Sequence, residues 1–73
     1  MKTVKVKSEI AGRVWKVVAK PGHAVAQEET LLILESMKME IPVPSPASGT
    51  LKELWVEEGE EVREGQDLAL LQT

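Results

Sequence analysis

The chain repeats itself once, and this repeat constrains its fold more than any other feature. A shift of 37 positions along the 73 residues needs no gap. It places Gly12 on Gly49, Gly22 on Gly59, Val25 on Val62, Leu31 on Leu68 and Leu34 on Leu71. A repeat that brings glycines and core residues into one register is typical of a duplicated structural unit. We therefore expect two copies of one unit, residues 3–35 and residues 40–72, related by a pseudo-twofold axis.

Each copy reads as about four short strands. Residues 3–7 alternate between polar and apolar, and residues 31–34 form a short apolar run typical of a buried strand. Between them, Val14, Val17 and Ala19 are spaced by a step of three that predicts a β-bulge, and Leu51, Leu54 and Val56 repeat it. No stretch has a sustained helical period. The expected fold is all-β, a flattened barrel or sandwich of two antiparallel sheets of about four strands.

Composition narrows the classes of function. We expect residues 1–73 to form a single domain, stabilised by sheet packing because cysteine is absent. The net charge of −3 and the lack of Phe and Tyr argue against a nucleic-acid partner. No apolar stretch approaches the ~20 residues that span a bilayer, and the first residues lack a signal-peptide core. A cytoplasmic location without membrane contact is therefore the expectation.

The segment between the two copies breaks a local rule. Glu35-Ser36-Met37-Lys38-Met39-Glu40 joins two apolar runs that are too close for a crossover, so we expect a tight hairpin with Met37-Lys38 at its tip. Such a tip requires positive φ angles and normally contains Asn-Gly or Asp-Gly. A rule broken at an exposed tip indicates function. The alternative is a solvated lysine beside methionines that pack back on the sheet.

Other candidates have simpler readings. His23 follows a Pro-Gly turn without an accompanying nucleophile pattern, which favours a solvated turn residue over a catalytic base. Trp15 and Trp55 favour structural packing over a ligand platform. The run of glutamates in residues 57–61 lacks calcium-loop spacing and favours a solvated turn over a cation site. Gly12, and its partner in the repeat, Gly49, are expected to need positive φ.

Taken together, these motifs resemble the biotinyl/lipoyl attachment domains, the carrier domains of biotin-dependent carboxylases and 2-oxo-acid dehydrogenases. The resemblance covers essentially the whole chain, and Met37-Lys38-Met39 is its most specific marker. The family's biotin branch has a methionine on each side of the modified lysine, whereas its lipoyl branch more often shows Asp-Lys-Ala. Ser36 stands where the family most often has alanine. The segment between Val18 and Val25 has no room for the protruding thumb of some bacterial acetyl-CoA carboxylase carriers.

The resemblance implies that Lys38 carries covalent biotin, attached by a biotin protein ligase. Met37 and Met39 would be recognised by the ligase, and Glu35, Ser36 and Glu40 would complete the flanking motif. The partners would be a biotin carboxylase and a carboxyltransferase, and the chain would be a monomeric carrier without catalytic or metal-binding residues. Two alternatives remain open: lipoate on Lys38, or an unmodified interaction module like the lipoyl-like domains of membrane-fusion transport proteins.

Overall fold

The computed structural model describes residues 2–73, and these form strands and turns without a helix. The eight strands are β1 (Thr3–Lys7), β2 (Gly12–Val17), β3 (Ala24–Val25), β4 (Thr30–Ser36), β5 (Met39–Pro44), β6 (Gly49–Leu54), β7 (Glu61–Val62) and β8 (Asp67–Gln72). Accordingly, no helix within residues 2–73 could cross a bilayer. The all-β expectation is confirmed.

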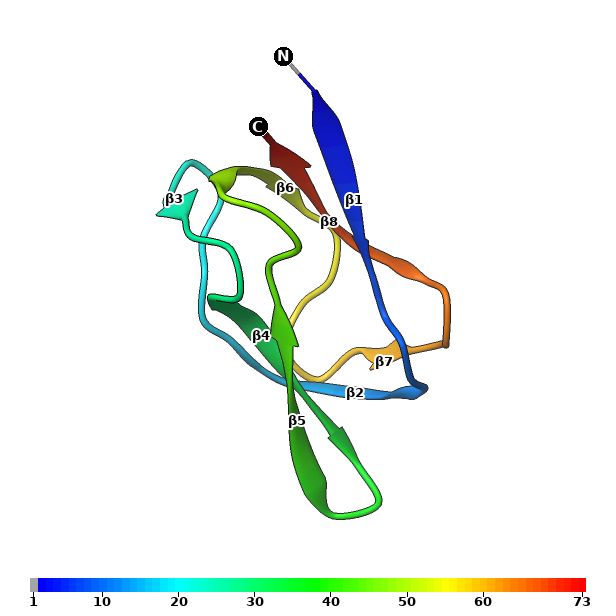
Figure 1. Cartoon of the computed structure of the whole chain (residues 1–73). Coiled ribbons are helices and arrows are strands. Elements are labelled where there is room, and N and C mark those ends of the chain that lie inside the picture. Colours follow the sequence, from blue (N-terminus) through cyan, green and yellow to red (C-terminus); the bar gives the residue numbers. More distant parts are fainter. Residues whose placement is uncertain (1) are drawn as a thin grey trace.

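The strands form two antiparallel four-stranded sheets, in the orders β1-β8-β6-β3 and β5-β4-β2-β7 (Figure 1). When each strand of the first sheet is replaced by its equivalent in the repeat, the first strand order becomes the second, which confirms the pseudo-twofold relation. Each sheet contains two strands from each copy. The two copies are therefore interleaved, because β4 of the first pairs with β5 of the second and β8 of the second pairs with β1 of the first.

The repeat extends to buried polar groups that the sequence patterns do not reveal. Ser8 and Ser45 are buried and lie 37 positions apart. Each hydroxyl donates to the carbonyl two residues further on, at Ile10 O (2.6 Å) and Ala47 O (2.7 Å). A buried hydroxyl without a partner is costly, so these local bonds let both strand ends enter the interior at little cost.

Apolar side chains from both sheets meet in one core. The fully buried leucines include Leu31, Leu34, Leu68 and Leu71, which are two pairs of repeat equivalents. Both predicted bulges are present, as register shifts between Val14 and Lys16 and between Leu51 and Glu53. Burying one such leucine contributes about 1.5–3 kcal/mol. Because equivalent strands contribute these side chains, the two copies stabilise the core symmetrically.

Two expectations about particular residues are wrong. Among the glycines, positive φ occurs at Gly22, Gly59 and Gly65 but not at Gly12 or Gly49. Gly12 and Gly49 are needed for space: a Cβ at Gly12 would lie 2.8 Å from the carbonyl oxygen of Glu35, and one at Gly49 would meet that of Gln72.

The second correction concerns the tryptophans, which are not packed in the core. Trp15 is 47% exposed and Trp55 is 40% exposed. Trp15 is the extra residue of the bulge in β2, and bulge residues are directed away from the regular alternation. The step of three correctly predicted the bulge but not the exposure of the residue it displaces.

The interleaving places the hairpin and the chain ends at opposite ends of the molecule (Figure 1). The β4–β5 hairpin projects at one end. At the other, Lys2 and Thr73 exchange two backbone hydrogen bonds, with N···O distances of 3.3 and 2.9 Å. The two ends of the described chain therefore meet opposite the hairpin.

Candidate functional site

The two residues at the hairpin tip adopt a backbone geometry that methionine and lysine do not favour. Ser36 pairs with Met39 and Glu35 with Glu40, which leaves Met37 and Lys38 as a two-residue turn. Their φ angles are 51° and 64°. Two consecutive positive φ angles define a type I′ turn, whose twist matches that of the flanking strands. The tight hairpin predicted from the sequence is present, and it holds two non-glycine residues in the left-handed region.

The three tip side chains point into solvent. Met37 is 92% exposed and Met39 is 63% exposed, so neither methionine packs back on the sheet. Lys38 is exposed, and its ammonium group has no hydrogen-bond or ion-pair partner among residues 2–73. An exposed apolar pair is unfavourable in water unless a partner covers it. The tip therefore presents a free primary amine between two adaptable apolar side chains.

The base of the hairpin is held rigidly by close backbone packing. β4 is the central partner of β2 and β5, and it approaches β2 so closely beside Glu35 that position 12 accommodates only glycine. β5 contains Pro42 and Pro44, which donate no backbone hydrogen bond and therefore suit the edge strand that β5 forms. The tip is thus the end of a two-stranded extension anchored in the sheet.

Two carboxylates flank the tip. Glu35 and Glu40 are exposed and face each other across the hairpin, where like charges oppose strand pairing. Arg13 lies opposite Glu35 on the other side, in β2. Glu35 therefore lies between a like charge on β5 and an opposite charge on β2.

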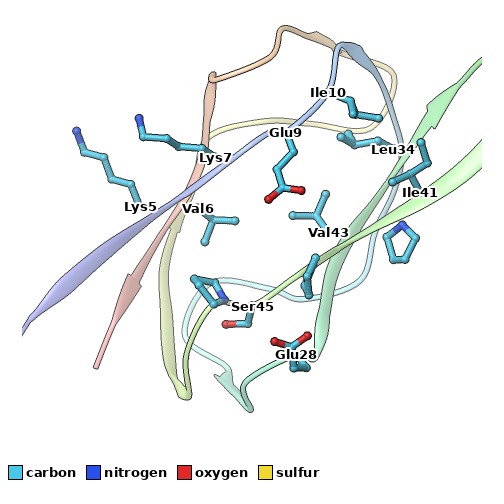
Figure 2. Close-up of a pocket in the computed structure, with 13 residues that line it drawn as sticks. Lys5, Val6, Lys7, Glu9, Ile10, Glu28, Leu34, Ile41, Val43 and Ser45 are labelled. Atoms are coloured by element: carbon cyan, nitrogen blue, oxygen red, sulfur yellow. The ribbon is translucent and has the colours of Figure 1, made fainter.

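Two hollows open on the surface of the described residues, one apart from the hairpin tip and one that reaches Met37, beside Lys38. One, of about 350 Å³, lies at the seam between β1 and β5, the facing edges of the two sheets (Figure 2). Val6 and Val43 form part of its apolar lining, and the Glu9 carboxylate points into it. The other, about 680 Å³ and more open, runs along the hairpin from Arg13 and Glu61 at its base to Met37 at its tip. Sequence reasoning missed both hollows, because they arise between strands that are distant in the chain.

The remaining polar candidates are dispersed. His23 is exposed in its turn, as predicted, and the glutamates of residues 57–61 are exposed. One of these, Glu58, accepts a hydrogen bond from the Val17 backbone at 3.0 Å. No group of three potential metal ligands occurs in the part of the chain that the structure describes. The chemistry of the described residues therefore concentrates at the tip.

One ion cluster shifts a pKa. The Asp67 carboxylate accepts a hydrogen bond from Lys7 at 2.7 Å and lies 3.7 Å from Lys5 Nζ. These lysines hold the pKa of Asp67 below its ordinary value of 3.8, and the hydrogen bond from Lys7 is the largest cause. The cluster lies on the sheet that does not contain the hairpin.

Known proteins are similar to this chain over nearly its whole length. A family model described as biotin-requiring enzyme matches residues 2–71. The chain is 44% identical over 63 residues to the biotin/lipoyl attachment protein of Bacillus subtilis, covering 86% of each protein. It is 42% identical to the pyruvate carboxylase of the same organism, of which it spans only 6%. It is also 34% identical to the dihydrolipoyllysine-residue acetyltransferase component of the Pseudomonas aeruginosa pyruvate dehydrogenase complex, of which it spans 11%.

Among solved structures, the urea carboxylase of Kluyveromyces lactis superposes on this chain with a TM-score of 0.92 at 30% identity. The superposition covers 99% of this chain and 6% of the carboxylase chain. A fold of this size and topology therefore also occurs as a small part of much longer enzymes.

Proposed function

The chain belongs to the family of biotin- and lipoyl-attachment domains, and from this premise we propose that it is a biotin carboxyl carrier whose Lys38 is the attachment residue. The observation that carries the proposal is the exposed tip, where Met37 and Met39 flank a lysine without a partner among residues 2–73. A solvated surface lysine needs neither exposed methionines nor a turn that disfavours its residues. A recognition element for a modifying enzyme accounts for both.

The geometry suits acylation of the lysine amine. Lys38 Nζ attacks the carbonyl carbon of a biotinyl adenylate, the new C–N bond forms, and the bond to the phosphate oxygen breaks with release of AMP. The amine loses a proton in this step, and no carboxylate pairs with Lys38 among residues 2–73, so a biotin protein ligase would accept the proton. Because the hairpin is already ordered, positioning the amine costs the ligase little entropy.

After attachment, the chain's own contribution is presentation. Biotin supplies the chemistry of carrying a carboxyl group, which we propose passes between a biotin carboxylase and a carboxyltransferase. The hairpin projects from the body of the domain (Figure 1) and has Lys38 in its turn, so two different active sites can receive the arm one after the other. Tethering keeps the local concentration of the cofactor high at both sites without tight docking. The chain would act as a non-catalytic, cytoplasmic carrier that is monomeric between encounters.

Lipoate on Lys38 is the second candidate function. The similarity to the acetyltransferase component of a pyruvate dehydrogenase complex favours it, as does the attachment protein's double name. Met37 and Met39 favour biotin, because in the lipoyl branch the lysine more often lies between aspartate and alanine. An unmodified interaction module, the third reading, would need no free amine at the tip.

Labelling in vitro tests the proposal. The chain is incubated with a biotin protein ligase, ATP and biotin, and the product is detected by streptavidin blotting and by mass. We expect labelling of the unaltered chain and none of Lys38→Arg, with the same melting temperature because the side chain is exposed. A labelled Lys38→Arg chain would contradict the assignment of Lys38. Unfolding of this variant would show that Lys38 is structural.

A further inference from the structure

Near its centre, the outer face of the hairpin-bearing sheet carries three apolar residues beside one exposed lysine, Lys16. Ile33, on β4, points outward and is half-buried. Its neighbours across the sheet are Pro42 on β5 and the bulge residues Trp15 and Lys16 on β2. Trp15 is about half exposed, and Pro42 is exposed. We call Trp15, Ile33 and Pro42 the β-face patch.

The pseudo-twofold relation supplies an internal control for this patch. On the other sheet, the equivalent of Ile33 is Leu70, whose neighbours across the strands are Lys5 on β1 and the bulge residues Lys52 and Glu53 on β6. Backbone, bulge and central aliphatic residue correspond, yet all three flanking residues are charged there, whereas on the hairpin-bearing sheet only Lys16 is charged. The fold itself therefore does not require Trp15 or Pro42 to be apolar, and one copy exposes them where the other exposes lysine.

The row of residues between the patch and the tip is charged on this sheet, whereas the equivalent row of the other sheet is uncharged. Glu35 lies there with Glu40 on one side and Arg13 on the other. The equivalent row of the other sheet contains Gln72 between Thr3 and Thr50. An apolar patch followed by two acidic residues and then by the amine thus occurs only on the sheet whose strands lead to Lys38.

The distance between the β-face patch and Lys38 indicates which partner would cover this face. Five residues of strand separate Ile33 from Lys38, or about 16 Å at ~3.3 Å per residue. An interface of about 800 Å² on one partner covers a disc of about 16 Å radius. An enzyme that acylates Lys38 must enclose the amine itself, so an ordinary interface centred on the tip reaches the patch. An enzyme that acts on the far end of a cofactor arm has no such requirement.

We propose that the β-face patch and the Glu35–Glu40 pair form the docking surface for the ligase that acylates Lys38, with Trp15 as the main anchor. The matching surface of the ligase is apolar and rimmed by basic residues. Tryptophan is enriched among residues that dominate binding energy. This inference rests on the proposed function, since it requires Lys38 to be modified.

Steady-state biotinylation of Trp15→Lys tests the docking surface, because the variant gives β2 the residue that β6 has at the equivalent position. We expect kcat/KM to fall about tenfold, mainly through a higher KM, because loss of the aromatic anchor weakens docking and leaves the amine unchanged. Pro42→Lys, which introduces the residue found at the equivalent position 5, should act in the same direction. Trp15→Phe should restore most of the lost activity.

The matched control is Trp55→Lys, which removes the other exposed tryptophan and should leave KM unchanged. Lys52→Trp, at the position equivalent to Trp15, should also have no effect. Equal kcat/KM for the unaltered chain, Trp15→Lys and Pro42→Lys, all folded by thermal melting, would overturn the docking surface while leaving the attachment of biotin intact. Absence of labelling in the unaltered chain would instead overturn the proposed function, and this inference with it.

Discussion

The two ends of the molecule share one backbone design and differ in what closes it. At one end, Ser36 and Met39 are joined through Met37 and Lys38. At the other, their repeat equivalents Thr73 and Lys2 are joined by hydrogen bonds alone, two between their backbones and one from the Thr73 hydroxyl to the Lys2 carbonyl. The fold thus builds the same strand pair twice, and a covalent two-residue turn makes one of them a presentation site. What distinguishes the ends is the turn and its side chains rather than the scaffold.

Exchanging the two closures should produce the largest effect. In a circular permutant of residues 2–73, Asn-Gly joins Thr73 to Lys2 and new ends open between Met37 and Lys38. We expect cooperative melting, because the new turn suits the existing strand pair, and complete loss of biotin labelling, because the turn no longer holds the lysine.

A second permutant, joined in the same way but opened between Glu57 and Glu58, keeps the hairpin and should be labelled normally. Its break falls among exposed residues, which tolerate new ends. Undiminished labelling of the permutant opened at the tip would show that the turn geometry is irrelevant to recognition. Both labelling by a ligase and thermal melting should be measured on each.

The variants Gly12→Ala and Gly49→Ala should have an intermediate effect on stability. Comparing them measures how tightly the strands pack at each end of the molecule. Each new Cβ meets a backbone carbonyl, that of Glu35 at the hairpin end and that of Gln72 at the terminal end. Forcing apart well-packed backbone costs typically about 1–3 kcal/mol. We expect urea denaturation to show a loss of stability for both, and a larger one for Gly49→Ala, where the approach is closer. An unchanged midpoint in either variant would show that the strands separate freely at that end.

The smallest effect is expected at the ion cluster, which has no counterpart in the repeat. Thr30, Pro42 and Pro44 occupy the positions equivalent to Asp67, Lys5 and Lys7. Folding lowers the pKa of Asp67, so its stabilisation is present above the ordinary value of 3.8 and disappears as pH falls through the lower value of the folded state. Asp67→Asn should therefore lower the melting temperature slightly at pH 7 and not at all well below pH 3.8.

High salt provides the control for this last prediction, because an exposed ion cluster is screened. The difference between Asp67→Asn and the unaltered chain should shrink at about 1 M salt, where the Debye length is about 3 Å. A difference that is independent of both pH and salt would mean that Asp67 acts through packing.

Local patterns in the sequence predicted a large part of this structure. The repeat predicted which strands are equivalent, the step of three predicted both bulges, and the short link predicted the hairpin with positive φ at Met37 and Lys38. These features depend on residues that are close in the chain or related by a single shift. The same is true of the tip, whose candidate residues all lie in one segment of six.

Features that depend on distant residues were not predicted. The sequence does not show that the copies exchange strands, because a repeat defines equivalent elements but not which of them pair. Gly12 was expected to have a positive φ angle, which it does not have. Its actual requirement, space for the Glu35 carbonyl, becomes visible only once β2 and β4 are paired. Trp15 was assigned to packing because side-chain size alone does not reveal the direction that a bulge gives it.

Whether Lys38 carries a covalent cofactor decides the proposed function, and an intact-mass spectrum of the protein from its native host, followed by peptide mapping, measures this. We expect the mass increment of biotin on the peptide that contains Lys38. A lipoyl increment on the same peptide would keep the attachment site and replace the carboxyl carrier by the second candidate function. An unmodified Lys38, unlabelled even after incubation with ligase, ATP and biotin, would contradict the carrier function and favour an interaction module.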